Sequence, residues 1–208
     1  QDQPSIGDAS LAGLPPLLTP EQAMFERRDT TVEANWKLLL EGFIEGYHIR
    51  STHPQSFLPY GFDNLNVIDL FGRCSRVTYP FQRIQKLAKL PPAERKVAGL
   101  LTYVYQLFPN VIIAVLSRHT SIVVLEPLAV DRTRMLSWLV SNDAGEEALI
   151  EARRDAEFVG TTGAEEDRAV VCAIQRGMAS GANDHFTFGH FESAIVHFHR
   201  SLDAALAF

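Results

Sequence analysis

The sequence has few cysteines, no surplus of basic charge and no long apolar run, and each shortage excludes a class of protein. Two cysteines in 208 residues rule out a disulfide scaffold, a four-cysteine zinc site and a four-thiolate iron–sulfur cluster within this chain. A net charge of -6 argues against phosphate binding, so no nucleic-acid partner is expected. No run approaches the roughly 18 apolar residues of a membrane span, and the N-terminus lacks the regions of a signal peptide. We therefore expect a soluble cytoplasmic protein with no membrane association.

What remains is the composition of a globular domain with a core. The chain is 46% hydrophobic and 21% charged, values that exclude a disordered or collagen-like protein. Residues 1–20 are rich in proline, glycine and serine and are interpreted as a linker. The pattern then predicts an edge strand over 25–34 and a helix over 35–48, with Asn35 as its N-cap. This helix should end before Pro54, because proline disfavours helical backbone at the preceding residue.

Six segments rich in β-branched and aromatic residues occupy the middle of the chain. They are VIDLF (67–71), SRVTYPF (75–81), LTYVYQLF (101–108), VIIAVLS (111–117), TSIVVLEPL (120–128) and RMLSWLV (134–140). Their spacing of roughly ten residues predicts an antiparallel meander, interrupted by charged, helical sequence over 82–99. The last third is helical again, with apolar stripes over 164–178 and 191–206. This order predicts an α+β domain with a large antiparallel sheet flanked by helices.

Two histidines that are five residues apart are candidate metal ligands. His48 and His53 can converge on one metal if the backbone turns between them, and neutral imidazole is a common ligand for transition metals. A mononuclear site would need a third ligand, for which a carboxylate is suited. Spacing alone favours the alternative of a solvated helix face, made by Lys37, Glu41, Glu45 and His48.

Asp167 is the candidate carboxylate, because it lies at the centre of the apolar stripe over 164–178. A carboxylate directed into a core is costly unless it is paired, hydrogen-bonded or bound to a metal. The residues alone favour equally a carboxylate stabilised by the dipole at a helix N-terminus. The other paired histidines and the two cysteines are interpreted as structural or surface residues: His185, His190, His197, His199, Cys74 and Cys172.

The residues around these candidates resemble the iron-site signature of Rieske-type non-haem iron oxygenases, the α subunits of ring-hydroxylating oxygenases. The match consists of Asn35-Trp36-Lys37, Glu41 and the run Glu45-x-Tyr47-His48-x-x-x-x-His53-Pro54. The C-terminal part is similar to the tail of the family's catalytic domain, in Glu166-Asp167, Gln175-x-Gly177 and Gly189-x-x-Glu192-x-x-Ile195-x-His197-Phe198-His199. The interval of 114 residues from His53 to Asp167 is in keeping with the family's long gap before its carboxylate ligand. The resemblance covers about residues 20–206.

The resemblance implies a helix-grip (START/Bet v1-like) fold and a mononuclear Fe(II) site. It makes His48, His53 and Asp167 the ligands of the iron, in the 2-His-1-carboxylate arrangement that leaves positions for dioxygen and substrate. It also implies that Glu45 hydrogen-bonds across a subunit boundary to a histidine of the neighbour's [2Fe–2S] Rieske cluster, by which electrons enter. Tyr47 is expected to pack beside the site.

The resemblance further implies O2, a small-molecule substrate, an NAD(P)H-dependent reductase (with or without a ferredoxin) and a homotrimer. The chain has neither the Cys-x-His nor the Cys-x-x-His pair that holds the family's cluster. We therefore interpret residues 1–20 as the linker from a missing N-terminal Rieske domain, and residues 21–208 as the catalytic iron domain, inactive alone.

The substrate class stays open between aromatic rings and N-methyl or other alkyl carbons. Glu45 and the compact C-terminal motif favour slightly the branch that oxidises quaternary ammonium compounds. Such a pocket needs aromatic faces or a carboxylate, and the strands offer Tyr103, Tyr105, Phe108 and Trp138. Two other functions remain alternatives: a non-enzymatic helix-grip protein that binds an apolar ligand, and a zinc-dependent hydrolase with the same three ligands.

Overall fold

The β-branched segments form one seven-stranded antiparallel sheet in the computed structural model, which describes residues 14–207. The strand order is β1-β7-β6-β5-β4-β3-β2, so strands that follow one another along the chain are neighbours from β2 to β7. The first strand pairs with the last and forms one edge of the sheet. The strands are β1 (Met24–Val32), β2 (Val67–Phe71), β3 (Cys74–Pro80), β4 (Leu101–Leu107), β5 (Val111–Val115), β6 (His119–Ala129) and β7 (Arg132–Ser141).

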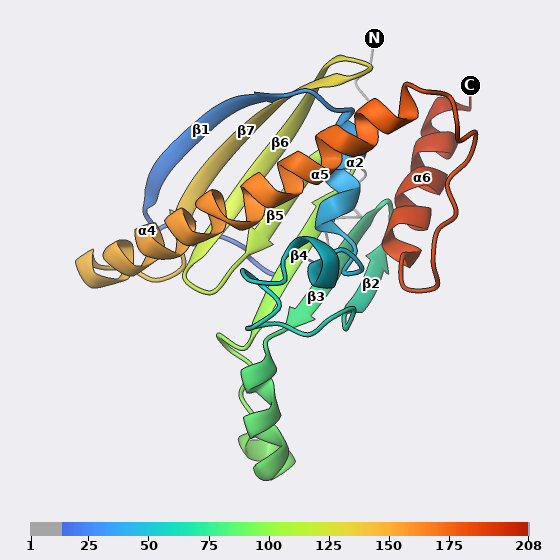
Figure 1. Cartoon of the computed structure of the whole chain (residues 1–208). Coiled ribbons are helices and arrows are strands. Elements are labelled where there is room, and N and C mark those ends of the chain that lie inside the picture. The colour runs from blue at the N-terminus through green and yellow to red at the C-terminus, as the bar shows by residue number, and fades with distance from the viewer. Residues whose placement is uncertain (1–13, 208) are drawn as a thin grey trace.

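The helices lie over one face of this sheet (Figure 1). α4 packs against β6 and β7, α6 packs against β2 and β3, and α2 contacts both β6 and α5. The helices are α2 (Trp36–Phe43), α3 (Ile49–Thr52), α4 (Glu146–Thr161), α5 (Gly163–Met178) and α6 (Ser193–Leu206). Within residues 14–207, no helix combines the length and the apolar character that crossing a membrane would require.

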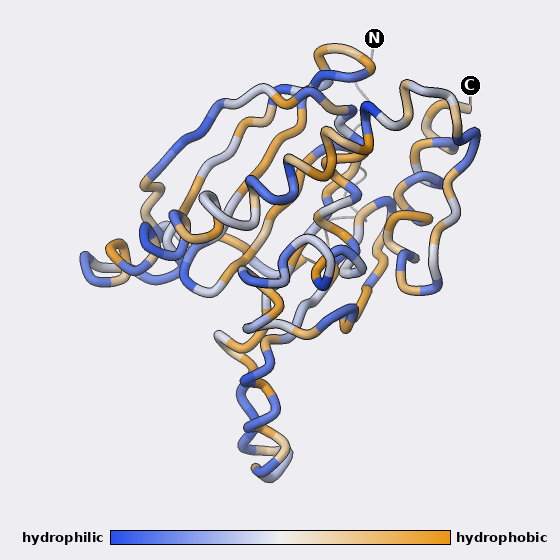
Figure 2. Tube along the Cα trace, viewed as in Figure 1, coloured by the Kyte–Doolittle hydropathy of each residue, from blue (hydrophilic) through white to orange (hydrophobic). Residues whose placement is uncertain are grey.

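The core lies between the helices and the sheet face that they cover. Leu40 and Ile44 near α2, Ile112 on β5 and Phe198 on α6 are fully buried members of one apolar cluster. Figure 2 shows the contrast between the apolar strands and the mostly hydrophilic segment that projects below them. That segment connects β3 to β4 and contains two 3₁₀ helices, Gln82–Lys89 and Pro92–Glu94, so the charged, helical sequence expected over 82–99 is an excursion from the sheet.

The α+β class and the antiparallel meander are confirmed. The segment 67–71 matches β2 at both ends, and the strand expected over 25–34 lies at the sheet edge as β1. The expectation of one continuous helix over 35–48 was wrong, because α2 ends at Phe43. The bounds of α4 were not predicted. Its buried residues are Ala152 and Ala156, and two small side chains do not produce the stripe of large apolar residues by which a helix is recognised in a sequence. Of the linker expected over 1–20, residues 1–13 lie outside the described residues, as does Phe208.

Candidate metal centre

Side-chain hydrogen bonds fix both the start of α2 and the segment that leads from it to the histidines. The Asn35 side chain caps the start of the helix, accepting from the Lys37 backbone N–H at 3.0 Å. At the other end, the buried Tyr79 hydroxyl on β3 lies 3.1 Å from the Phe43 carbonyl and 3.0 Å from the Glu45 carbonyl. Tyr79 therefore ties the segment that leads to His48 onto the sheet, and burial raises the pKa of its hydroxyl well above 10.0, with a further contribution from the Glu45 charge.

A single helical turn separates the two histidines. His48 lies at the N-terminal end of α3 and His53 at its C-terminal end, immediately before Pro54. This four-residue helix is the backbone turn that the five-residue spacing requires, and it brings the two ring centroids to 5.1 Å. His53 is fully buried, whereas 20% of the His48 side chain is exposed.

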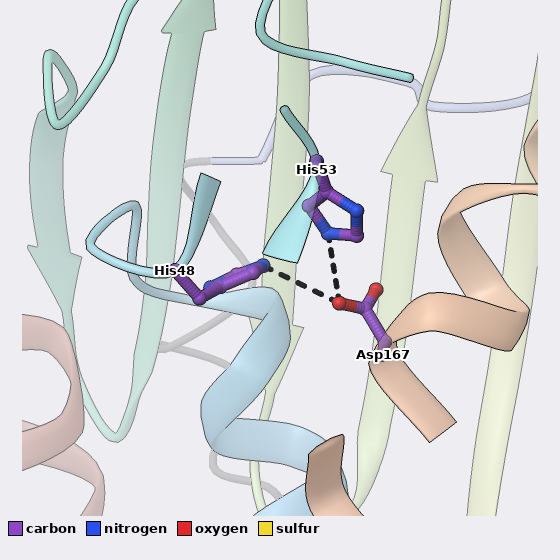
Figure 3. Close-up of side chains that lie close together, drawn as sticks. All are labelled: His48, His53 and Asp167. Carbon is purple, nitrogen blue, oxygen red and sulfur yellow. Dashed lines mark ion pairs between the residues drawn. The ribbon is translucent and has the colours of Figure 1, made fainter. Parts of the chain in front are cut away.

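Asp167 on α5 completes the group (Figure 3). Its Oδ1 lies 2.8 Å from Nε2 of His53 and 3.5 Å from Nε2 of His48. One ligand atom from each of the three residues lies within 4.8 Å of the others, so the group could hold a metal ion. The Asp167 side chain is 43% exposed, which leaves the group open on the side of the carboxylate.

A second carboxylate holds the far nitrogen of each histidine. Glu45 Oε1 bonds to Nδ1 of His48, and Glu166 Oε2 lies 2.7 Å from Nδ1 of His53. The Ser56 hydroxyl donates to the same Glu166 oxygen at 2.6 Å. Because each carboxylate keeps a proton on Nδ1, the lone pair of each Nε2 is free on the side of Asp167, as in metal-binding carboxylate–histidine pairs.

The buried Nε2 of His53 supports this reading of the donor set. It lies 2.8 Å from Asp167 Oδ1 but lacks hydrogen-bond geometry, so it has no hydrogen-bond partner among the described residues. A buried nitrogen without a partner is costly unless something else binds it. Two imidazole nitrogens and a carboxylate oxygen suit a first-row transition metal, so the residues present fit a metal ion.

The carboxylates also set the protonation of the buried ring. Burial disfavours the charged form of His53, but Asp167 and Glu166 outweigh it, and the pKa of His53 is raised above 6.5. The hydrogen bonds from Ser56 and His53 lower the pKa of Glu166 below 4.5. In the metal-free chain, protonated His53 therefore stabilises the fold fully below pH 6.5, and this contribution is lost as the pH rises through the raised pKa.

Metal affinity should have the opposite pH dependence, because only neutral His53 can bind a metal. We expect the affinity of the metal-free chain for Zn²⁺ or Fe²⁺ to increase with pH, by up to about tenfold per pH unit for one released proton. The increase should continue above pH 6.5 before it levels off. Calorimetric titrations across this range measure it. Glu166→Gln, which removes one charge that raises the pKa, should move the plateau to lower pH, and a pH-independent affinity would contradict the expectation.

The other sequence candidates lie apart from this group or act differently. The ring of Tyr47 packs edge-on against Phe191 at 6.2 Å, and its backbone N–H donates to Glu45, so a role for its ring beside the metal stays a prediction. On the face predicted to be solvated, Glu41 Oε1 lies 2.8 Å from Nε2 of His199, and Glu45 holds His48. His185 is exposed and pairs with Asp184.

Two points of the sequence reasoning about Asp167 need correction. Val170, Ile174 and Met178 of the supposed buried stripe are each more than a third exposed, and only Val171 is buried. The stripe is therefore not what orients Asp167; the geometry of α5 relative to α3 does so. Glu166, which the sequence analysis named only as part of the Glu166-Asp167 motif, is the partner of His53. The pairing with Ser56 and His53 across about 110 residues has no local sequence signal.

The sequence that forms this fold and this candidate site matches the model of a known protein family. The model described as "Ring hydroxylating alpha subunit (catalytic domain)" matches residues 21–207. A search of curated proteins finds no match.

Solved structures share the fold at low sequence identity. A quaternary ammonium Rieske monooxygenase, CntA, in complex with an inhibitor, matches with a TM-score of 0.68 and 16% identity over 89% of this chain and 49% of that chain. Naphthalene 1,2-dioxygenase from Rhodococcus sp., bound to indole, matches at 0.65 and 15% over 87% and 56%. Dicamba monooxygenase matches at 0.60 and 12% over 89% and 59%. The chain thus spans about half the length of these solved chains, and the expected helix-grip fold is confirmed.

Proposed function

The chain belongs to the family of ring-hydroxylating α-subunit catalytic domains, and on this premise we propose that it hydroxylates an organic substrate with O2 at one ferrous iron. The convergence of His48, His53 and Asp167 supports the proposal best, because two nitrogens and one carboxylate oxygen are the facial ligand set of non-haem iron oxygenases. When bound, ferrous iron would supply up to three further coordination positions for O2 and substrate. The carboxylate would offset one of its two charges.

The chain's own residues would prepare this site in three ways. Glu45 and Glu166 keep protons on the far nitrogens of the two histidines and so orient both rings. Ser56 and the Tyr47 backbone amide hold these carboxylates in place. The buried position of His53 keeps water away from one side of the group, while the partly exposed Asp167 leaves the other side accessible.

Electrons must reach the site from outside these residues, because the chain lacks the cysteine and histidine pairs of a Rieske cluster. We assign their source to a [2Fe–2S] Rieske cluster that an NAD(P)H-dependent reductase, with or without a ferredoxin, would reduce. Glu45 is our candidate for the contact with a neighbour's cluster in a homotrimer. Inter-subunit electron transfer in a quaternary ammonium Rieske monooxygenase of the same fold supports this assignment.

Removal of the Glu166 carboxylate should weaken metal binding without removing a ligand. We expect Glu166→Ala to lower the affinity for Fe²⁺ by about 10- to 100-fold, because His53 loses the acceptor that fixes its ring and tautomer. Glu166→Gln keeps an acceptor oxygen, so its affinity for Fe²⁺ should fall by less. Ser56→Ala, which removes only the hydroxyl donor, is the matched control and should lose least. Equal affinities for all four proteins would contradict the positioning role.

Anaerobic reconstitution of the metal-free chain with ferrous iron tests the proposed function. We expect about one iron per chain and its loss in His48→Ala. With a Rieske protein and its reductase supplied, hydroxylated product should form only when O2 is present. Preferential zinc binding together with hydrolysis in the absence of oxygen would instead support a zinc-dependent hydrolase. A metal-free chain that binds an apolar ligand tightly, and binds no iron, would support a ligand-binding protein.

A further inference from the structure

Two uncharged polar side chains lie buried and unpartnered in the core below the helices. Ser75 on β3 and Gln106 on β4 are register partners in the antiparallel ladder, so their side chains are direct neighbours on one face. Both residues are fully buried. Within residues 14–207, the Ser75 hydroxyl and both the Oε1 and Nε2 atoms of Gln106 have no hydrogen-bond partner. Buried polar atoms are almost always paired, so three unpaired atoms at one place require an explanation.

The surroundings of the pair are apolar. Val77 and Val104, two residues along the same strands, belong to the core cluster, and Ile112 opposite Gln106 is fully buried. The pair therefore occupies the sheet face that α2, α5 and α6 cover, which is also the face over which the metal ligands lie (Figures 1 and 3). No fully buried residue in 14–207 is a carboxylate, so nothing in the core offers a counter-charge to a cation.

Three of the four aromatic side chains that were candidates for a cation-binding pocket lie on the outer face of the sheet, whereas Phe108 belongs to the core cluster. Tyr103 and Tyr105 alternate with Val104 and flank the guanidinium of Arg76, at 5.7 and 6.0 Å from the ring centroids, on the opposite face of the sheet. Trp138 continues the same outer row and stacks with Arg27. A quaternary ammonium group needs such ring faces or a carboxylate around it. Although rings such as Phe108 belong to the core cluster, the unpaired polar groups of Ser75 and Gln106 are a hydroxyl and an amide.

We propose that Ser75 and Gln106 form the polar end of the substrate-binding space, and that the substrate is a neutral, largely apolar molecule with one hydroxyl, carbonyl or amide group. The inference deepens the proposed function and rests on it, because it takes the substrate to lie between the helix layer and the sheet. The amide and hydroxyl can both donate to and accept from such a group. A charged group buried there would be left without a partner.

The position of the pair also limits the shape of the substrate. Tyr79, which supports the segment before His48, is four residues from Ser75 on β3, roughly 13 Å along the strand. A molecule that extends from the segment beside Tyr79 to the pair must therefore be elongated. Because both side chains are fully buried, a ligand that reaches them must displace the groups that cover them.

Thermal unfolding with a matched pair of probes tests the inference. In the 208-residue chain, 2-naphthol should bind about three- to tenfold more tightly than naphthalene at equal concentration, the range of one net hydrogen bond. Choline should give no stabilisation. In Gln106→Met, which keeps the length of the side chain, the preference for 2-naphthol should disappear. Equal stabilisation by the two probes in the wild-type chain, no stabilisation by 2-naphthol, or a larger shift with choline overturns the proposal.

Stability measurements separate this role from ordinary core packing. Gln106→Met should unfold at no lower temperature than the wild-type chain, since no hydrogen bond within the protein is lost. The control is Thr133→Val: Thr133 is equally buried but donates to the Ala34 carbonyl at 2.7 Å, so it should lose stability and keep the 2-naphthol preference. A Gln106→Met chain as destabilised as Thr133→Val would show that the amide is already paired, and would overturn the proposal.

The two proposals can fail separately, because probe binding is measured without metal. A chain that binds no iron but loses the 2-naphthol preference in Gln106→Met would contradict the oxygenase function and support the polar pair. A chain that binds one iron but binds 2-naphthol and naphthalene equally tightly would support the oxygenase function and contradict the role of the polar pair.

Discussion

Asp167→Ala is expected to abolish binding of ferrous iron, with a loss in affinity of more than about 100-fold. Loss of an orienting partner alone typically costs 10- to 100-fold, and this substitution removes a proposed ligand atom together with the carboxylate that, in residues 14–207, lies beside both Nε2 atoms. The fold should persist, because the Asp167 side chain is partly exposed and fills no core space. Iron content after reconstitution, compared with thermal unfolding of the metal-free chain, measures both effects.

Glu165→Ala is the matched control for this prediction. Glu165 lies two residues earlier on α5 and is exposed, so its loss removes one negative charge from the same helix without touching the histidines. We expect iron binding close to that of the wild-type chain. If Asp167→Ala and Glu165→Ala lost iron equally, the general charge of the helix would govern binding, and the assignment of Asp167 as a ligand would be wrong.

Gly163→Ala is expected to be the most damaging small change to the fold around the site. A Cβ at Gly163 would lie 2.1 Å from Cζ of Phe57, far inside van der Waals contact. The Phe57 ring cannot move freely, because it packs between His53 at 4.7 Å and Phe158 at 6.1 Å. Overpacking of this kind costs about 1–3 kcal/mol, and we expect the upper end. Chemical denaturation of the metal-free chain measures the cost.

The same clash should reach the metal site, because the displaced ring contacts His53 and Gly163 begins the helix that carries Asp167. Iron affinity should therefore fall together with stability. Gly177→Ala provides the control in the same helix, since a Cβ there meets nothing within 4 Å. Alanine should stabilise that position by up to about 1 kcal/mol. A Gly163→Ala chain as stable as the wild type would show that Phe57 has room to rotate.

The strands could be predicted from sequence because their signal is local. β2 was located to the residue, since its β-branched and aromatic residues distinguish it from the sequence around it, and the meander followed from even spacing. The end of α2 could not be predicted in this way. The segment that follows α2 is held by the Tyr79 hydroxyl, which comes from a strand more than thirty residues later and contacts the Phe43 and Glu45 carbonyls.

The candidate metal site likewise combines residues that a local signal identifies with residues that only distant contacts identify. The spacing of His48 and His53 and the resemblance to a family identified the three residues that the structure brings together. The physical argument for Asp167 was nonetheless wrong, because α5 leaves most of its apolar residues exposed in this chain. Glu166 was missed because its partners, His53 and Ser56, belong to another part of the sequence.

The pairing of the first strand with the last determines when the protein can fold during its synthesis. β2 to β7 can pair one after another as they emerge, but Arg27 on β1 must wait for Trp138, about 110 residues later. Contacts between such distant residues form late, because the loop that they close is long. Until then β1 remains an unpaired edge, which is a site of misassociation between nascent chains. His53 waits still longer for Asp167, so the residues that could hold a metal are brought together only after the sheet is complete.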